Sequence, residues 1–404
     1  MSEYLEPRKS SKAEKPKEVS LEERYGRNTD VSDIYIRHTL KASGMVGSAG
    51  AISTSLSASE GLERSKKLGA HLAELSEPSP EGVVKLGSSN LGRTYETAQA
   101  LKAGYIGDAT PGNDQVVDFS EQEIQTWAAR RRSIMQSRSL VPKDVTEEAL
   151  EEKFKSLPFD QQVAIAQESA SAVRDFAPRM PSGLSALSQP RYIEKWDAEK
   201  RKLMSERGVI SPDVTDAQLK EKFNGLSADE QAKIAEDSEI PVMEEWINNT
   251  ESELAKLYPL EEWAAKFAVL VDRNRKSVGR LYSGSSIDRL NTTHKTVMEP
   301  LLMKILVLPD GSKPKTLADI GGQIGLNDGW ALRTKTDANG EPASRLFMYR
   351  VKDFHTDNPR YEQSEYKVDI KELERLADIG VKVEHEQRKA EIAKNPELWK
   401  LKES

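Results

Sequence analysis

The chain has 404 residues, of which 37% are hydrophobic and 31% charged, and it carries a net charge of −7. This composition predicts a folded core with exposed helical or disordered segments. It argues against a general nucleic-acid-binding protein, because no basic excess is present to neutralise phosphates. The absence of cysteine excludes a disulfide framework, a thiolate metal site and a cysteine nucleophile.

No apolar run approaches the roughly 20 residues that a membrane-spanning helix needs. Residues 1–30 are rich in Lys, Glu and Ser and contain no apolar signal-peptide core. We therefore interpret residues 1–30 as a disordered charged tail, and we expect a cytoplasmic protein with no membrane partner.

The first folded element is predicted within SDIYIRHTL, residues 32–40. The Ile-Tyr-Ile run at 34–36 is typical of a short buried strand, which would end on Arg37 and His38. A polar strand end is the simple interpretation. The alternative is a phosphate-handling site, because open α/β folds bind their ligands at the carboxyl edge of the sheet.

Two helices and a second strand follow. The Gly/Ser/Ala-rich stretch at 43–58 predicts a long loop, and an amphipathic helix with Ser59 as its cap comes next. The segment EGVVKLGSS predicts a strand, and LGRTYETAQALKAG predicts a helix that stops at Gly104. Alternating strands and helices predict a mostly parallel sheet. We assign residues 31–121 to the first part of this α/β domain.

Residues 122–256 are nearly all helical in pattern and contain an internal duplication. The segment starting at Trp196 repeats the one starting at Trp127 without a gap, and both keep Trp, Met, DVT, KF and IA in register. Two copies are too few for a solenoid. We therefore predict a helical insertion with two related modules, 124–169 and 193–238, which could mediate homodimerisation or bind a partner protein.

The α/β pattern returns in residues 257–355, which we assign to the second part of the domain. A long helix is predicted first, then a strand ending near Thr293 and a helix opening around His294. An Asn-Gly pair predicts the turn of a hairpin within GWALRTKTDANGEPASRLFMYRV. Residues 356–404 predict a charged C-terminal helical extension. The expected fold class is α/β, a three-layer αβα architecture with a mostly parallel sheet and an inserted all-helical region.

Four polar residues would meet at one edge of this sheet. Arg37 and His38 end the first strand, Arg93 lies on the first turn of the helix after the second strand, and His294 follows a later strand. Arginine guanidinium groups match phosphate oxygens in bidentate geometry, and helix N-termini attract anions. A histidine can act as a nucleophile toward phosphorus at neutral pH. The four residues therefore predict a phosphate pocket.

Three motifs around these residues resemble the histidine phosphatase superfamily, also called phosphoglycerate-mutase-like. IRHT matches its Arg-His-Gly strand end, SNLGRTYETA its second arginine segment, and TTHKTVMEPLL its late second histidine. The second match is the most specific. The resemblance covers about residues 31–121 and 256–351, and the helical duplication and both tails lie outside it. Thr39 stands where the family has glycine, which would narrow the pocket or offer a hydroxyl to the phosphate.

The resemblance implies roles for individual residues. His38 would be the nucleophile that forms a phosphohistidine, and Arg37, Arg93 and His294 would bind the phosphoryl group and stabilise its charge. The family's acid/base is a carboxylate a little under 30 residues beyond the second arginine, where this chain has Glu121.

Two neighbouring carboxylates, Glu123 and Asp118, are alternatives to Glu121. His355 lies in a charged, loop-like context and is predicted to be solvated. Trp127 and Trp196 are predicted to be core anchors of the modules and not ligand stackers. No His/Asp/Glu cluster has the spacing of a metal site, so we expect neither a metal nor another cofactor.

The leading hypothesis is a metal-independent phosphomonoesterase that acts on a small-molecule or protein phosphomonoester through phosphorylated His38. A phosphoglycerate-mutase-type phosphomutase is the enzyme alternative. The alternative from another class is a non-catalytic scaffold that binds a phosphorylated ligand and uses its helical modules for partner binding. The presence of both histidines favours catalysis, because a binding protein does not need His38 as a nucleophile.

Overall fold

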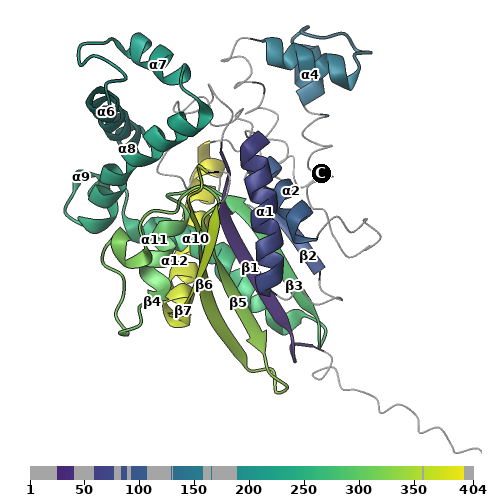
Figure 1. The fold of residues 1–404 in the computed structure, drawn as a ribbon. Coiled ribbons are helices and arrows are strands. Elements are labelled where there is room, and N and C mark those ends of the chain that lie inside the picture. Colours follow the sequence, from purple (N-terminus) through teal and green to yellow (C-terminus); the bar gives the residue numbers. More distant parts are fainter. Residues whose placement is uncertain are drawn as a thin grey trace, which may run out of the picture.

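The computed structural model describes residues 25–40, 59–76, 83–88, 92–106, 129, 131–157, 165, 189–356 and 359–394 (Figure 1). The predicted N-terminal tail, up to residue 24, and the predicted loop at 43–58 lie outside these ranges. None of the described helices has the length and apolar character needed to cross a membrane.

A seven-stranded mixed sheet forms the centre of the molecule, in the order β2-β3-β1-β5-β6-β7-β4. The strands are β1 (Asp30–Arg37), β2 (Val83–Ser88), β3 (Ser286–Thr293), β4 (Leu306–Val307), β5 (Gly329–Thr336), β6 (Pro342–Lys352) and β7 (Arg360–Val368). In the described sheet, β1 and β2 each pair with β3 in parallel, whereas the other four pairings are antiparallel. The prediction of a mostly parallel sheet was therefore wrong, because β5, β6 and β7 continue it as an antiparallel meander, which short connections impose.

Helices cover both faces of the sheet, which gives the three αβα layers predicted from the sequence. Successive residues of β1 point to opposite faces: Ile34 and Ile36 join one apolar cluster with residues of α1 and α2, whereas Tyr35 joins the other cluster. The helices of the first face are α1 (Ser59–Ser76) and α2 (Gly92–Tyr105). Those of the second face are α10 (Leu260–Lys276), α11 (Met298–Ile305) and α12 (Ile370–Lys394), with short 3-10 turns η4 (Ser277–Arg280) and η5 (Leu317–Ile320).

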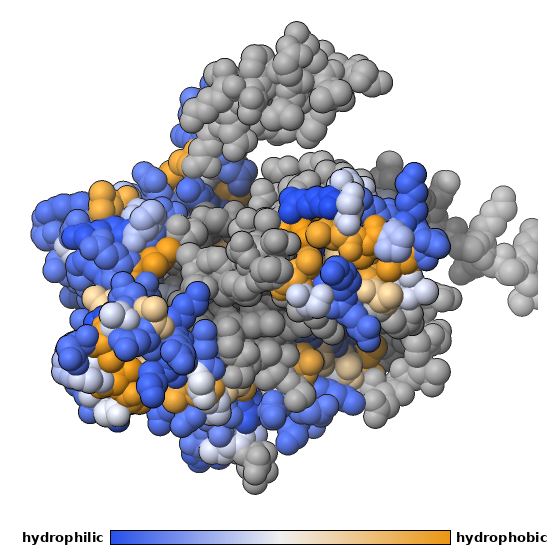
Figure 2. Space-filling model, turned by 90° about the horizontal axis from the view of Figure 1, so that it is seen from above, coloured by the Kyte–Doolittle hydropathy of each residue, from blue (hydrophilic) through white to orange (hydrophobic). Residues whose placement is uncertain are grey.

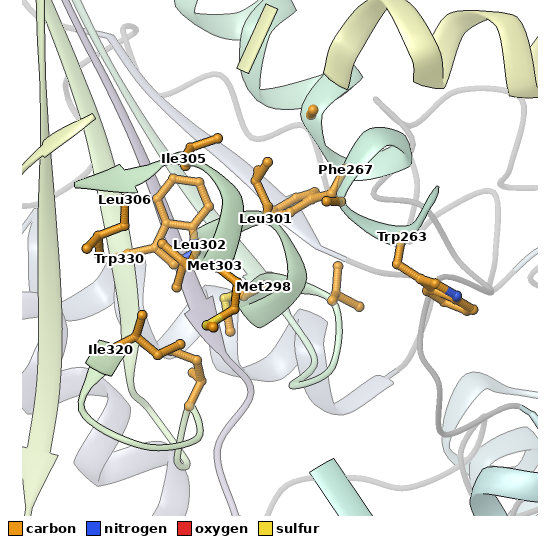
Figure 3. Close-up of a cluster of buried hydrophobic side chains, with 14 of the residues drawn as sticks. Trp263, Phe267, Met298, Leu301, Leu302, Met303, Ile305, Leu306, Ile320 and Trp330 are labelled. Carbon is orange, nitrogen blue, oxygen red and sulfur yellow. The ribbon is translucent and has the colours of Figure 1, made fainter. Parts of the chain in front are cut away.

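Large side chains fill the second face. Trp330 of β5 lies at the centre of the cluster, with its ring centroid 4.7 Å from that of Tyr35 and 6.0 Å from that of Phe267 (Figure 3). Side chains of α11 such as Leu301 pack around it and are fully buried. This cluster joins β1 to α11, the helix that begins shortly after the end of β3.

The helix was predicted to stop at Gly104. The structure ends it one residue later, and Gly104 has a role in packing instead of in ending the helix. Helix α2 continues to Tyr105, and Gly104 instead permits a close approach between two helices. A Cβ on Gly104 would lie 1.8 Å from the carbonyl oxygen of Lys66 in α1, and one on Gly69 would lie 2.0 Å from the carbonyl oxygen of Leu101 in α2. The two glycines therefore let the backbones of α1 and α2 touch.

The predicted hairpin is confirmed as β5 and β6. Gly340 closes its turn with a φ of +88° and donates its N–H to the carbonyl oxygen of Asp337. The C-terminal helix is present as α12, but β7 lies within the range that was predicted to be helical extension. Its surface is half exposed and rich in Glu, Gln and Lys, so it carries little of the apolar alternation that identifies a strand.

The helical insertion contains α4 (Glu147–Ser156), α6 (Pro190–Glu206), α7 (Asp216–Asn224), α8 (Ala228–Asn248) and α9 (Glu253–Leu257). Each copy of the duplication has its own small core. Met135, Val141, Leu150, Phe154 and Ile165 in the first copy correspond to Met204, Ile210, Leu219, Phe223 and Ile234 in the second.

The polar contacts repeat in the same way. Arg132 donates to the carbonyl oxygen of Val145 at 2.6 Å, and Arg201 donates to that of Val214 at 2.7 Å. The two copies thus fold alike over the described residues. Trp196 packs against the second core and donates its indole N–H to Ala235 and Ser238, so the prediction of a core anchor is confirmed for this residue. Trp127 lies outside the described residues.

Figure 2 shows one side of the described surface. Seen from above, it is mainly hydrophilic, and hydrophobic residues gather in separate areas (Figure 2). Among described residues, the most exposed large apolar side chains are Tyr282, Val381 and Leu257, which belong to different elements. The homodimer or partner-protein surface on the helical insertion stays a prediction.

Candidate phosphate site

Two histidines meet where neighbouring strands end. Strands β1 and β3 are parallel, with Arg37 opposite Thr293, and the backbone N–H of His38 donates to the carbonyl oxygen of Thr293 at 2.9 Å. His38 and His294 therefore leave the sheet side by side. Their ring centroids are 5.1 Å apart with an angle of 61° between the ring planes, and both side chains are buried.

The environment of His38 fixes its tautomer. Nδ1 lies 2.7 Å from the carbonyl oxygen of Thr39. Because a carbonyl oxygen only accepts hydrogen bonds, Nδ1 carries the proton in the neutral ring. The lone pair is then on Nε2. A nucleophilic histidine needs this arrangement, in which one nitrogen is held by a hydrogen bond and the other presents electrons.

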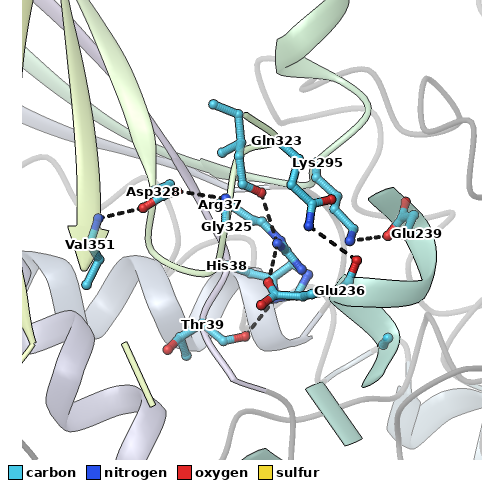
Figure 4. Close-up of polar contacts among 12 residues, drawn as sticks. Arg37, His38, Thr39, Glu236, Glu239, Lys295, Gln323, Gly325, Asp328 and Val351 are labelled. Carbon is cyan, nitrogen blue, oxygen red and sulfur yellow. Dashed lines mark hydrogen bonds and ion pairs between the residues drawn. The ribbon is translucent and has the colours of Figure 1, made fainter. Parts of the chain in front are cut away.

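Arg37 is buried beside His38 and directs its guanidinium toward two partners. Its Nη1 donates to the carbonyl oxygen of Ile324 at 2.9 Å and to Oε1 of Glu236 at 2.6 Å (Figure 4). Its Nε has no hydrogen-bond partner within the part of the chain that the structure describes. An unsatisfied buried guanidinium nitrogen is unfavourable, so Arg37 retains capacity for an anion that accepts from more than one of its nitrogens.

Of the two effects expected of Thr39, the narrower pocket stays a prediction, whereas the hydroxyl is engaged elsewhere. Its hydroxyl donates to the carbonyl oxygen of Gly61 at 2.8 Å, and its backbone N–H donates to Oγ1 of Thr97 at 3.1 Å. These bonds join the end of β1 to α1 and α2. The hydroxyl is therefore engaged in fixing the two helices against the site and does not point to a phosphate.

The turn after β3 differs from the predicted helix start. Helix α11 begins at Met298, so His294 opens a turn and not a helix. In this turn Thr296 has a φ of +67°, a conformation that β-branched residues rarely adopt. Oε2 of Glu299 accepts from the N–H of Thr296 at 2.7 Å, while Oε1 accepts from that of Ile324 at 3.0 Å. One buried carboxylate thus holds the His294 turn and the loop that contacts Arg37.

That loop is held from its other side by an ion pair. Asp328 accepts from Arg350 at 3.0 Å and from the backbone N–H groups of Gly325 and Val351 (Figure 4). The backbone carbonyl of Asp328 accepts from the N–H of Arg37 at 2.8 Å. Arg350 also donates to the carbonyl oxygens of three residues in the same loop. These bonds hold the backbone of Arg37 and the loop beside it, and they leave the Arg37 side chain little freedom.

Glu236, on α8 of the second module, is the anionic centre of the site. Besides Arg37 it faces His355, whose Nε2 is 3.7 Å from Oε2 of Glu236. Burial raises the pKa of Glu236, but Arg37, His355 and Lys295 outweigh it and bring the pKa to about 2. The contact with Glu236 in turn raises the pKa of His355, against burial and with help from Asp229. Glu236 is therefore ionised at any ordinary pH.

Lys295, next to His294, forms a buried ion pair with Glu239 of α8. Glu239 also accepts from the hydroxyl of Tyr192 at 3.0 Å. Burial is the main effect on Lys295 and lowers its pKa, partly offset by Glu239. The site thus contains two cation–carboxylate pairs in which the cation comes from the α/β domain and the carboxylate from α8.

The structure places some, not all, of the residues predicted for the site. Arg37, His38 and His294 are brought together. Arg93 is the second residue of α2, which follows β2 at the same edge of the sheet. The structure describes the backbone of Arg93 but not its side chain. Glu121 lies outside the described residues, as do its alternatives Glu123 and Asp118. Within the described ranges no three His, Asp or Glu side chains form a group that could hold a metal ion.

Sequence reasoning missed four residues of the site: Glu236, Glu239, Lys295 and His355. The prediction that His355 is solvated was wrong, because its Nδ1 lies 2.7 Å from Asp229 and its other nitrogen faces Glu236. Lys295 could have been noticed from its place beside His294. The two glutamates had no signal, because they lie in a polar helix that the duplication alone does not connect to the sheet.

No protein-family model and no curated protein matches the chain. Among solved structures it is similar to the phytase of Hafnia alvei, with a TM-score of 0.42 and 11% identity over 88% of this chain and 97% of that one. The phytase of Citrobacter braakii gives 0.40 and 12%, over 87% and 96%. The multiple inositol polyphosphate phosphatase of Bifidobacterium longum gives 0.32 and 12%, over 85% and 89%.

These neighbours are two phytases and an inositol polyphosphate phosphatase. Because the TM-scores and identities are low, the function of this chain is argued below from its own residues.

Proposed function

We propose that the protein is a metal-independent phosphomonoesterase that hydrolyses its substrate through a phosphohistidine on His38. The observation that supports this best is the pair of adjacent histidines beside a buried arginine, with Nδ1 of His38 held by a backbone carbonyl. This arrangement presents Nε2 as a nucleophile next to a fixed positive charge. Nucleophilic catalysis at phosphorus requires both.

In the first step Nε2 of His38 attacks phosphorus, the bond to the ester oxygen breaks, and the leaving alcohol takes up a proton. Arg37 and His294 stabilise the charge on the phosphoryl oxygens, with Arg93 as the third proposed ligand. In the second step water attacks the phosphohistidine and releases inorganic phosphate and His38. Glu121 is the proposed acid that protonates the leaving oxygen and then the base that activates water.

The first test is phosphate release from p-nitrophenyl phosphate in the presence of EDTA. The wild type should be active, and His38→Ala should lose at least about 1,000-fold in rate, because removal of a nucleophile removes the reaction path. His71→Ala is a matched control, since His71 lies on α1 and stacks on Tyr361 away from the site. It should keep wild-type activity.

Two results would contradict the proposal: activity that survives in His38→Ala, or wild-type activity that EDTA abolishes. Wild-type protein that binds phosphate but shows no turnover with any phosphomonoester would favour the phospholigand-binding scaffold.

A further inference from the structure

Helix α8 presents three carboxylates to the α/β domain on one face. Asp229, Glu236 and Glu239 are separated by seven and three residues, spacings that bring side chains to the same side of a helix. All three make ion pairs with the α/β domain. We call these residues the acidic face of α8.

The positively charged side chains that contact the acidic face of α8 come from four separate segments of the α/β domain. Arg64 lies on α1, Arg37 ends β1, Lys295 follows β3 and His355 follows β6. Asp229 contacts Arg64 at 3.1 Å and His355 at 2.7 Å. Such a convergence of positive groups is what a phosphorylated ligand needs, yet here every described cation of the group is covered by α8.

The contact at Arg37 is the critical one. Glu236 lies 2.6 Å from Nη1 of Arg37 (Figure 4), the guanidinium to which a phosphoryl group is proposed to bind. A carboxylate and a phosphate each present a pair of oxygens that can accept hydrogen bonds from the same guanidinium nitrogens. They cannot occupy this position together, because two anions within hydrogen-bond distance of one another repel.

The Glu236 contact is also one that can be exchanged. The Glu236 side chain keeps 17% of its surface exposed, against 7% for Arg37, so Glu236 is the less deeply buried partner of the pair. The single hydrogen bond from Arg37 to Glu236 leaves Nε of Arg37 without a partner among the described residues. A phosphate with three terminal oxygens can satisfy that nitrogen as well.

We propose that Glu236 is an internal competitor of phosphate: in this structure the second helical module holds the site in a self-inhibited state, and a phosphorylated ligand binds by displacing the Glu236 carboxylate from Arg37. The proposal rests on the phosphate-binding role proposed above for Arg37. The module of residues 193–238 is then a regulatory element of the site, in addition to any role in partner binding.

The duplication supplies the test substitution. In the first copy the position equivalent to Glu236, which is 69 residues earlier, carries Gln167. Glutamine at this position is therefore compatible with the module, and Glu236→Gln should fold. Asp237→Asn is the matched control, because Asp237 is the next residue, pairs with Arg207 and does not contact the site.

The experiment measures binding of orthophosphate directly, by isothermal titration calorimetry at pH 7, so that it does not depend on turnover. If Glu236 occupies Arg37 in about 90% of wild-type molecules, removing the competitor should tighten phosphate binding about tenfold. Asp237→Asn should change it less than about twofold. Glu236→Ala, which leaves no hydrogen-bonding group, should tighten it at least as much as Glu236→Gln.

Equal or weaker phosphate binding in Glu236→Gln, or no phosphate binding in any variant, would overturn the proposal. A loss of turnover in Glu236→Gln without tighter binding would instead assign Glu236 to catalysis, and it would also overturn the competitor role. Tighter binding in a protein that shows no turnover would support the competitor and contradict only the proposed hydrolase function.

Discussion

At the scale of single residues, buried charged groups decide how the protein responds to pH. Asp288 of β3 is nearly fully buried, with Oδ2 accepting from the hydroxyl of Tyr105 at 2.9 Å. Burial is the main reason that its pKa rises to about 6, with Asp30 adding to the effect and Tyr105 and Arg333 opposing it. Asp33 of β1 shows the same rise to about 6, chiefly because of its burial.

A carboxyl group whose pKa is raised on folding binds its proton more tightly in the folded state. Its stabilising contribution is complete below the unfolded pKa of about 4 and is lost as the pH rises through about 6. Asp288→Asn should therefore gain stability relative to the wild type between pH 4 and pH 7, by up to about 3 kcal/mol. Urea unfolding at several pH values measures this. A difference between the two proteins that does not change with pH would contradict the cause assigned to the shift.

Other residues of the site show that the sequence predicts which residues carry the chemistry better than it predicts which residues touch one another. Arg37, His38 and His294 could be singled out because two strand-end motifs carry them. Thr39 could be seen to replace a glycine, but its bond to Gly61 depends on where α1 starts in space. Glu236 is one of many glutamates in a polar helix, and only the docking of α8 distinguishes it.

At the scale of elements, the packing of α1 on α2 depends on two glycines. The Cβ of Gly69→Ala would lie 2.0 Å from a backbone carbonyl of α2, and that of Gly104→Ala 1.8 Å from one of α1. A backbone carbonyl cannot move aside as a flexible side chain can, so an added Cβ would force α1 and α2 apart. Each change should cost about 2 kcal/mol or more of unfolding free energy. Because the two helices carry bonds to Thr39, each change should also weaken phosphate binding.

The control for these variants is Gly279→Ala, where a Cβ would meet no atom within 4 Å and the backbone φ is not positive. It should alter the urea midpoint little. Equal destabilisation by Gly69→Ala and Gly279→Ala would mean that the close approach of the helices is not what constrains Gly69.

The sequence predicted where most helices and strands lie better than it predicted how the strands pair in the sheet. A continuous apolar run identified β1, and a periodic leucine pattern identified α1, because each signal lies within one segment. The direction of a strand in the sheet depends on its connections, and the short links before and after β6 made its two pairings antiparallel. Strand β7 was missed since its mostly exposed residues lack a buried face.

At the scale of the whole molecule, the described parts of the two duplicated modules differ in what they contact. Both have equivalent cores, but α8 of the second copy reaches Arg37 and Lys295. The sequence revealed the duplication and could not reveal this difference, because the residues in register are core residues and the docking residues are polar. Within the described residues, the contacts between the insertion and the site are made by α8.

The pair Phe154 and Phe223 can separate the two modules experimentally. Each is buried in the core of its own module, at equivalent positions, and replacement by alanine should cost its module about 3 kcal/mol or more. Phe223→Ala should loosen α8 and tighten orthophosphate binding, whereas Phe154→Ala should leave this affinity unchanged. Calorimetric titration of both variants makes the comparison. Identical affinities in the two variants would argue against a link from the second core to Arg37.

The measurement that tests the central claim most directly is rapid-quench trapping of the phosphorylated protein, followed by mass spectrometry under alkaline conditions that preserve phosphohistidine. The wild type, mixed with p-nitrophenyl phosphate and EDTA, should carry one phosphoryl group on His38, and His38→Ala should carry none. Phosphate found on another residue, or turnover with no phosphorylated protein at any quench time, would contradict a mechanism through His38.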